Sequence, residues 1–130
     1  MSGFGDTTRR LLRGRRAEAA GRGAEDVAAA ALARDGWRVL ARRTRTPAGE
    51  LDLVAERDGL LAFVEVKARP SLTEAAFALD ARQRMRLIAA AEWWVAANPG
   101  HGEAGMRFDV VIVAADGTAR RIADAFRIGD

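Results

Sequence analysis

Two acidic residues and one lysine lie in the two most distinctive segments of the chain. Residues 49–54 read GELDLV, and residues 63–69 read FVEVKAR. Asp52 falls in the first of these segments, and Glu65 and Lys67 fall in the second. Carboxylate oxygens are the ligands that Mg²⁺ prefers, and a bound divalent cation can activate water for attack on a phosphodiester. The three residues are therefore candidates for metal-assisted hydrolysis.

The turn between these segments determines which side chains meet. Asp58-Gly59 is typical of a two-residue hairpin loop, because both positions tolerate a positive φ. With that loop, Asp52 is expected directly opposite Glu65. Two positions further from the turn, Glu50 is expected opposite Lys67. Because residues two apart share a face of a strand, all four side chains are expected on one face.

Two carboxylates that face each other destabilise a hairpin unless something bridges them. Opposed Cβ atoms lie about 4.5–5.5 Å apart, and like charges at that distance repel. Glu65 also lies in the most apolar strand of the chain, where a carboxylate needs a partner or a metal ion. We therefore expect Asp52 and Glu65 to hold a divalent cation, Mg²⁺ or Mn²⁺. The alternative is a solvated acidic pair beside a salt bridge between Glu50 and Lys67.

Lys67 is the only lysine of the chain, and all the other basic residues except His101 are arginines. An ammonium group can shift its pKa and take part in proton transfer, whereas a guanidinium cannot. We expect Lys67 to position or polarise the attacking water, or to stabilise charge that develops on the phosphate.

Composition excludes several other kinds of chemistry. The chain has 130 residues, which suits one domain, and 30% of them are charged. It has no cysteine and a single histidine, so disulfide scaffolds, thiolate zinc sites and multi-histidine metal sites are excluded. No apolar run reaches the roughly 18 residues of a membrane span. We therefore expect a cytoplasmic protein with no membrane partner.

Positive charge is concentrated at the start of the chain. Residues 1–16 contain five arginines and one aspartate, whereas the whole chain has a net charge of +3. The remaining residues therefore have a slightly negative balance. We expect residues 1–16 to form a flexible basic arm, either a phosphate-binding tail or a solvated terminus, and residues 17–130 to form the domain.

Helices and strands with clear sequence signals must position the candidate residues. Residues 18–35 have apolar positions at helical spacing, and residues 79–97 form a second amphipathic segment. Strand patterns are found in five segments: residues 37–43, 50–56, 60–68, 106–114 and 118–123.

The resulting order of elements is α-β-β-β-α-β-β. A helix between the third and fourth strands predicts a parallel, right-handed crossover pair, whereas the hairpin strands are antiparallel. We therefore expect an α/β domain with a mixed sheet flanked by helices.

The hairpin segments resemble the signature of a known family. GELDLV and FVEVKAR are similar to the G-E-[IL]-D-L-[IV] and F-V-E-V-K-x-R motifs of the YraN family of small bacterial proteins. The likeness extends over roughly residues 19–127 and includes Gly23-Ala24-Glu25 and Asp124-Ala125-Phe126. That family is similar to the PD-(D/E)XK nuclease superfamily, and in particular to archaeal-type Holliday junction resolvases.

The resemblance implies a restriction-endonuclease-like α-β-β-β-α-β core and a nuclease site. Asp52, Glu65 and Lys67 would form the catalytic triad, with the carbonyl of Val66 as a third metal ligand. Glu25 would be a fourth acidic group that assists through a metal-bound water, and its position at the border of the apolar stripe of its helix allows this. The alternative for Glu25 is a surface glutamate. Related resolvases act as dimers, so the resemblance also implies a homodimer.

Polar residues near the hairpin and at the start of the second helix are candidates for contacts with nucleic-acid phosphates. The residues predicted to bind nucleic acid are Arg45, Arg69, Gln83 and Arg84. Gln83 stands where the family often has lysine, and Arg43 stands where it usually has asparagine. The alternative is that these arginines are ordinary solvated side chains.

Trp93 and Trp94 lie next to each other in the second predicted helix. Adjacent positions point about 100° apart on a helix, so we expect one ring in the core and the other partly exposed. An exposed ring could stack on bases.

The sequence therefore predicts a Mg²⁺-dependent endonuclease that hydrolyses phosphodiester bonds of DNA, branched DNA included. Two other functions stay open. The first is a non-catalytic nucleic-acid-binding accessory module of recombination or repair with the same fold. The second is an interaction protein whose acidic hairpin only forms salt bridges.

Overall fold

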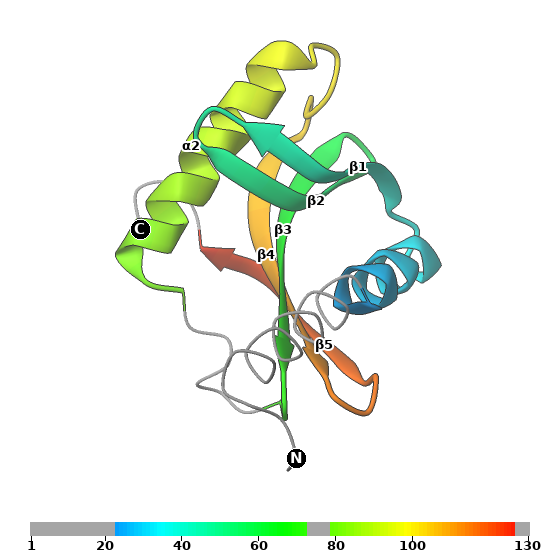
Figure 1. Ribbon diagram of the computed structural model, residues 1–130. Helices are drawn as coiled ribbons and strands as arrows, with labels where there is room; N and C mark the ends of the chain where they lie inside the picture. Colours follow the sequence, from blue (N-terminus) through cyan, green and yellow to red (C-terminus); the bar gives the residue numbers. More distant parts are fainter. Residues whose placement is uncertain (1–22, 73–78, 127–130) are drawn as a thin grey trace.

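Figure 1 shows the computed structural model of the chain, in which residues 23–72 and 79–126 are described. The first helix occupies residues 23–34 of this part. The elements that follow are β1 (Arg38–Thr46), β2 (Gly49–Arg57), β3 (Leu60–Arg69), α2 (Ala81–Ala97), β4 (Gly105–Ala114) and β5 (Ala119–Phe126). Their succession is the predicted one. The predicted basic arm of residues 1–16 lies outside the described residues, as does the predicted start of the first helix.

The strands of the described part form one mixed sheet in the order β1-β2-β3-β4-β5. β3 and β4 are parallel, whereas the other neighbouring strands are antiparallel. A parallel pair needs a long connection between its strands, and α2 lies in that connection. The predicted α/β class with a mixed sheet, matching an α-β-β-β-α-β restriction-endonuclease-like core, is confirmed.

The two helices lie on opposite sides of the sheet (Figure 1). The first helix packs through small side chains, among them Ala24 and Ala28, against one apolar cluster. Larger side chains form the cluster under α2: Leu51, Phe63, Leu87, Trp94, Phe108 and Phe126. Each large apolar side chain buried in this way contributes roughly 1.5–3 kcal/mol. The sheet is therefore held firmly on both faces, and its strand ends are fixed in place.

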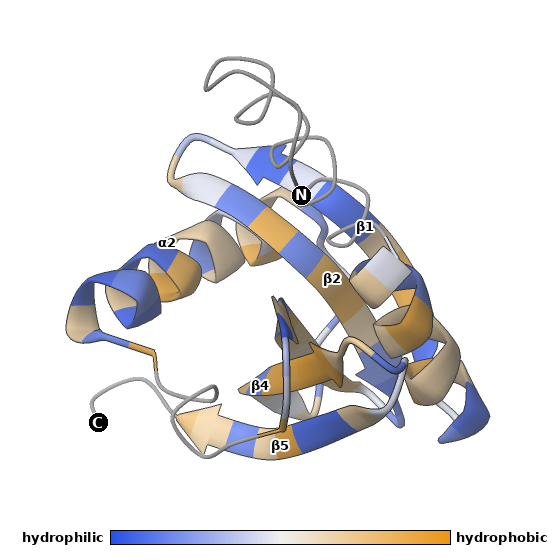
Figure 2. Cartoon of the chain, turned by 60° about the horizontal axis from the view of Figure 1, so that its bottom comes forward, coloured by the Kyte–Doolittle hydropathy of each residue, from blue (hydrophilic) through white to orange (hydrophobic). Residues whose placement is uncertain are grey.

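Hydropathy follows the pattern that such a two-faced sheet requires. Figure 2 shows polar and apolar residues alternating along the first part of β2, and Leu53, Val54 and Ala55 form a continuous apolar stretch further along. Successive side chains of a strand point to opposite faces, so this stretch supplies apolar side chains to the clusters on both sides of the sheet. Among the helices of the described residues, none combines the length and the apolar character needed to cross a bilayer.

The turn between β2 and β3 is the predicted two-residue loop. Asp58 has a φ of 51° and Gly59 a φ of 80°, which is the left-handed conformation that the loop requires. Arg57 pairs with Leu60 across the turn, as expected. The local signal in the sequence therefore set the register of the hairpin correctly.

The pairing of β2 with β3 ends sooner than the sequence predicts. The last ladder pair joins Leu53 to Val64. The next predicted pair, Asp52 opposite Glu65, is not part of the ladder. Beyond this point β2 continues to pair with β1, and β3 continues to pair with β4. The two strands of the hairpin thus separate at the position of the candidate acids.

Three element boundaries also differ from the prediction by two residues or more, and one of them is the end of β5, which lies at Phe126 rather than at residue 123. β1 continues to Thr46, where it still pairs with Gly49 at the start of β2. α2 begins at Ala81 rather than two residues earlier. Asp80 caps this helix, because its side chain accepts the backbone N–H of Gln83 while the Gln83 side chain accepts the N–H of Asp80. This reciprocal capping box fixes where the helix starts.

Candidate functional site

The structure brings Asp52 and Glu65 together at the point where β2 and β3 separate. Val66 donates its backbone N–H to Oδ2 of Asp52 over 2.8 Å, so the carboxylate satisfies a main-chain donor at the opening of the ladder. The carboxyl groups of Asp52 and Glu65 also share a hydrogen bond. Both side chains are partly buried. The two predicted acids therefore face one point, although their backbones are not paired.

Burial raises the pKa of both acids. For Asp52 burial is the largest cause, and the hydrogen bonds from Val66 and Glu65 oppose it. For Glu65, burial and then the charge on Asp52 raise the pKa to about 7. The positive charge of Arg86 opposes this rise. A divalent cation would favour the charged form of both groups and remove the repulsion between them.

Lys67 lies two positions after Glu65 on β3 and is 8% exposed. Burial, followed by the positive charge of Arg69, lowers the pKa of Lys67. The negative charges of Glu65 and Asp80 oppose this shift. A lysine with a lowered pKa can release or take up a proton near neutral pH more readily than a solvated one. Lys67 thus combines burial with a pKa below its ordinary value, two positions from Glu65.

Glu25 lies close to the same site. It comes from the first helix, is 8% exposed, and has its Oε1 3.7 Å from Nε of Arg43. Burial and then the charge on Asp52 raise the pKa of Glu25, whereas Arg43 opposes the rise. The charge of Asp52 thus acts on Glu25, and the role of Glu25 as a fourth acidic group stays a prediction.

Glu50 does not lie opposite Lys67, which corrects the predicted pairing. The ladder between their strands ends before it reaches them, because β2 leaves β3 at that point. Glu50 instead pairs with Arg45 in the β1–β2 ladder. Its Oε1 lies 3.9 Å from Nε of Arg43, and its side chain is 38% exposed. Glu50 therefore belongs to the rim of the site on the β1 side.

Arg43 combines both of these ion pairs with an unusual backbone. Its φ is 50°, a left-handed value that side chains other than Gly, Asn and Asp rarely adopt. Such a residue costs about 1–3 kcal/mol and persists only where its surroundings hold it. Here Glu25 and Glu50 hold its guanidinium. The site thus contains one strained residue, which no local sequence signal reveals.

Arg86 belongs to the arginine cluster at the start of the second helix that could hold phosphates, but it is not one of the four residues predicted to bind nucleic acid. Its Cδ lies 3.0 Å from the point where a Cβ on Gly49 would stand, so the glycine leaves room for the arginine. Its charge lowers the pKa of both Asp52 and Glu65. The basic start of α2 was a sequence signal, but the phase of the helix decides which arginine faces β2. That residue is Arg86, two positions after the predicted Arg84.

The four residues predicted to bind nucleic acid lie around the site with different partners. Arg45 on β1 and Arg69 at the end of β3 are exposed. Gln83 forms the capping box of α2. Arg84 donates from Nη1 to the carbonyl of Leu79 at 3.2 Å, again within the start of the helix. Arg69 likewise donates from Nη1 to the carbonyl of Ala68 over 2.9 Å. Gln83, Arg84 and Arg69 therefore have local structural partners, and Arg45 and Arg69 are the two that are exposed.

The donor set at the hairpin suits a hard divalent cation. Mg²⁺ binds through one or two carboxylates and completes its shell with waters and phosphate oxygens. Asp52 and Glu65 supply two carboxylates that already touch each other. Within residues 23–72 and 79–126, no three acidic or histidine side chains gather as a metal-binding group. The protein ligands would therefore be these two acids, with the carbonyl of Val66 as a candidate third.

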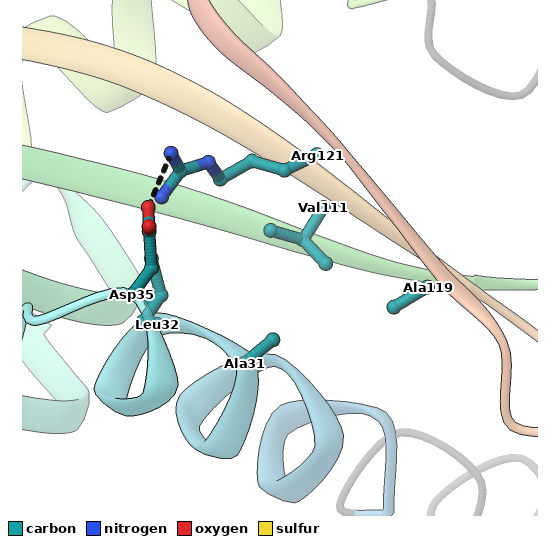
Figure 3. Close-up of a pocket in the computed structure, with 6 residues that line it drawn as sticks. All are labelled: Ala31, Leu32, Asp35, Val111, Ala119 and Arg121. Carbon is teal, nitrogen blue, oxygen red and sulfur yellow. Dashed lines mark hydrogen bonds and ion pairs between the residues drawn. The ribbon is translucent and has the colours of Figure 1, made fainter.

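A hollow elsewhere in the molecule contains none of the predicted residues. It has a volume of about 200 Å³ and lies between the first helix and strands β4 and β5 (Figure 3). Apolar side chains line most of it, and Asp35 binds Arg121 at its edge over 3.1 Å. Nothing in this lining resembles a catalytic group, so the hairpin remains the candidate site.

Comparison with known proteins gives one consistent result. Residues 24–113 match the model of a family described as "Uncharacterised protein family UPF0102". A UPF0102 protein of Granulibacter bethesdensis is 56% identical over 122 residues, which cover 94% of this chain and 77% of that protein. A UPF0102 protein of Azorhizobium caulinodans is 54% identical over 112 residues, 86% of each chain. One from a Bradyrhizobium species is 51% identical over 106 residues, 82% of this chain and 75% of that protein.

Proposed function

The chain belongs to the UPF0102 family, the YraN family that its hairpin segments resemble, and we propose that it is an endonuclease that hydrolyses phosphodiester bonds of DNA with a divalent cation. One observation supports this most strongly. Asp52 and Glu65 share a hydrogen bond where the hairpin opens, with the amine of Lys67 following on the same strand. A protein gains no stability from two buried acids that repel each other, so a function explains their presence better than folding does.

The chemistry follows from the groups that the site contains. A divalent ion at the two acids supplies positive charge beside the phosphate and lowers the pKa of a nearby water. Asp52 and Glu65 bind and orient that ion, and the Val66 N–H holds Asp52 in place. Lys67 positions the attacking water and stabilises the negative charge that develops on the phosphate. Glu25 assists by orienting water at the side of the first helix.

The phosphate itself needs a positive partner outside the metal site. Arg86 stands beside the two acids and packs on Gly49. A guanidinium can hold two phosphate oxygens at once, which fixes the orientation of the scissile bond. Arg45 of β1 and Arg69 of β3 are exposed and can hold phosphates further along the backbone. The choice of DNA, and of branched DNA among its forms, rests on the resemblance to junction resolvases.

A cleavage assay tests the proposal. The purified full chain is incubated with a labelled four-way junction and with a flap, in Mg²⁺ or Mn²⁺. We expect the wild type to cut at least one substrate, and Asp52→Asn and Lys67→Ala to cut neither. Asp52→Asn keeps an acceptor for the Val66 N–H, so a loss of cleavage is not a loss of folding. Asp26→Asn, which changes an exposed acid of the first helix, is the matched control and should cut normally.

Cleavage together with DNA binding by the same three proteins decides between the nuclease and the non-catalytic binding module. If the wild type and both variants bind DNA equally and none of them cuts it, the chain is a non-catalytic nucleic-acid-binding module and the nuclease proposal is wrong. If the wild type binds neither a divalent ion nor DNA, both functions that rest on the hairpin fail.

A further inference from the structure

Helix α2 carries two arginines and a tryptophan along one line of its surface. Arg82, Arg86 and Trp93 stand at positions i, i+4 and i+11, so they lie within about 40° of one another around the helix axis. A helix rises about 1.5 Å per residue, which places Trp93 roughly 16 Å along the axis from Arg82. Both arginines are exposed, and Trp93 is 42% exposed. We refer to these three residues as the α2 row.

The exposure of Trp93 is not a consequence of a poor core. Its neighbour Trp94 is 4% exposed and packs edge-on against Phe63 with 6.0 Å between the ring centroids. The sequence prediction that one of the two rings is buried and the other partly exposed is therefore confirmed. A large aromatic ring that remains in water at the side of a well-packed helix is a candidate contact for another molecule.

The charges of the row are unfavourable for the helix itself. The start of a helix is its positive end, where acidic side chains stabilise it and basic ones do not. The first turn of α2 contains no acidic residue, and arginines stand at 82, 84 and 86. Within the described part of the chain, neither Arg82 nor Arg86 forms an ion pair. Arg82 is therefore available to an anion from outside, and Arg86 offers a charge that also acts on Asp52 and Glu65.

The row begins at the candidate nuclease site. Arg86 packs on Gly49 and acts on the charges of Asp52 and Glu65, whereas Trp93 lies two turns further along α2. A chain of phosphates that leaves the site past Arg86 would reach Trp93. Glu92 and the exposed Met85 lie on the other edge of the exposed face, about 100° or more from Arg86. The α2 row therefore presents two positive charges and an aromatic ring, and Glu92 lies outside it.

We propose that the α2 row binds a single-stranded segment of DNA next to the bond that is cut, with phosphates at the arginines and a base stacked on Trp93. This inference rests on the proposed function, because it places the segment by its distance from the nuclease site. A base can stack on an aromatic ring only where its face is free, as in a single strand. Within a duplex the faces are covered by neighbouring bases. The row therefore selects DNA with an unpaired strand, such as a flap or an opened junction.

Tryptophan fluorescence tests this directly. The full chain is titrated with an oligodeoxythymidylate of about 10 nucleotides in EDTA, so that no cleavage occurs. The other two tryptophans, Trp37 and Trp94, are 3% and 4% exposed, so quenching by a stacked base reports on Trp93. We expect quenching with the single strand and none with a blunt duplex of the same length. Trp93→Leu should weaken binding about ten-fold or more, whereas Trp93→Phe, which keeps a ring, should weaken it much less.

Met85→Ala is the matched control, because it removes an exposed apolar side chain from the same helix but off the row. It should bind the oligonucleotide as the wild type does. The inference is wrong if Trp93→Leu binds with wild-type affinity, or if the wild type shows no quenching. It is also wrong if Trp93→Leu converts a dimer into a monomer without changing the affinity for the oligonucleotide, since the face would then join two copies of the chain.

Failure of this inference can be distinguished from failure of the nuclease proposal. Binding is measured without a divalent ion, and Asp52→Asn, which removes a negative charge that acts on Arg86, should still bind the oligonucleotide and quench. Quenching without any cleavage in Mg²⁺ would refute the nuclease proposal alone. Cleavage without quenching would refute the role of the α2 row alone.

Discussion

Two carboxylates on neighbouring strands, one buried and one partly buried, are satisfied in opposite ways. Asp109 of β4 is 1% exposed, and its two oxygens receive the guanidinium of Arg107 at 3.1 Å and the backbone N–H of Asp124 at 2.8 Å. Glu65 of β3 lies one register position away from it. Its hydrogen bond is to another acid, Asp52, and its pKa is raised to about 7. The same sheet therefore holds one matched and one mismatched carboxylate.

The different partners of Asp109 and Glu65 distinguish a carboxylate that stabilises the fold from one that is available for function. A buried carboxylate that meets a guanidinium is neutralised in the folded protein and needs nothing further. Glu56 follows the same rule, because hydrogen bonds from the Gly102 N–H and then from His101 lower its pKa. Two acids that meet each other repel when both are charged, and the nearby charges of Arg86 and Lys67 oppose the rise in the pKa of Glu65 without abolishing it. Such a pair is stable only with a shared proton or a cation, which is the condition of a metal site.

The largest effect is expected on cleavage. Asp52→Asn, Glu65→Gln and Lys67→Ala should each reduce the rate of DNA cleavage about 10²-fold or more, because each removes a charge that acts in the transition state. Asp109→Asn should reduce the rate only in proportion to the fraction of unfolded protein. Single-turnover rates on the best substrate measure this. Equal loss of activity in Asp109→Asn and Asp52→Asn, with both folded, would remove the distinction between the two carboxylates.

The next effect is on the free energy of unfolding, where Asp109→Asn and Asp52→Asn should differ. Asp109→Asn should lower the free energy of unfolding by about 3 kcal/mol, because it leaves the guanidinium of Arg107 without its buried partner. Asp52→Asn should leave it unchanged or raise it by about 1 kcal/mol, because it ends the repulsion with Glu65 and keeps an acceptor for Val66. Urea unfolding without metal measures both. A large destabilisation by Asp52→Asn would mean that the acidic pair is structural.

The pH dependence of stability should show the raised pKa of Glu65. Its ordinary pKa of 4.5 applies to the unfolded chain, and the folded value is about 7, so the folded protein binds more protons between these values. Its contribution to stability is therefore lost as the pH rises from about 4.5 to about 7, and it is level above that range. We expect a difference of about 1–3 kcal/mol over this range between the wild type and Glu65→Gln.

Glu92→Gln, which changes an exposed glutamate of α2, is the control for this measurement and should follow the wild-type curve. Parallel curves for the wild type and Glu65→Gln would show that burial and the charge of Asp52 do not hold Glu65 in its neutral form.

The smallest effect concerns the strained residue at the rim of the site. Arg43→Asn and Arg43→Gln both remove the charge that pairs with Glu25 and Glu50, but only asparagine adopts a φ of 50° easily. We therefore expect Arg43→Asn to be more stable than Arg43→Gln by about 1 kcal/mol. Thermal unfolding of the two variants side by side measures this, and equal stability would mean that the backbone at this position is not strained.

The parts of the structure that depend on local chemistry could be predicted from the sequence. Asp58-Gly59 favours a tight two-residue turn with positive φ. The residue pairs of β2 and β3 next to this turn can therefore be assigned by counting outward from Arg57 and Leu60. The helix between β3 and β4 favours a parallel pair, because parallel strands need a long connection between them. These signals were enough to bring Asp52 and Glu65 to one place.

The parts that depend on distant neighbours could not be predicted. The β2–β3 ladder ends at Leu53 because β2 stays paired with β1 while β3 stays paired with β4. No residue type within the hairpin predicts this separation. It prevents the opposition of Glu50 and Lys67 that counting from the turn predicts. The choice of Arg86 over Arg84 likewise depends on how α2 is rotated against β2, which its apolar core residues and Gly49 decide together.

Binding of Mn²⁺ to the metal-free protein tests the central claim most directly. Calorimetric titration of the wild type should show one bound ion, with an affinity that rises as the pH increases through about 7, because the proton shared by the two acids must leave. Asp52→Asn and Glu65→Gln should each bind at least about ten-fold more weakly. Unchanged affinity in both variants, or no binding by the wild type, would contradict the account.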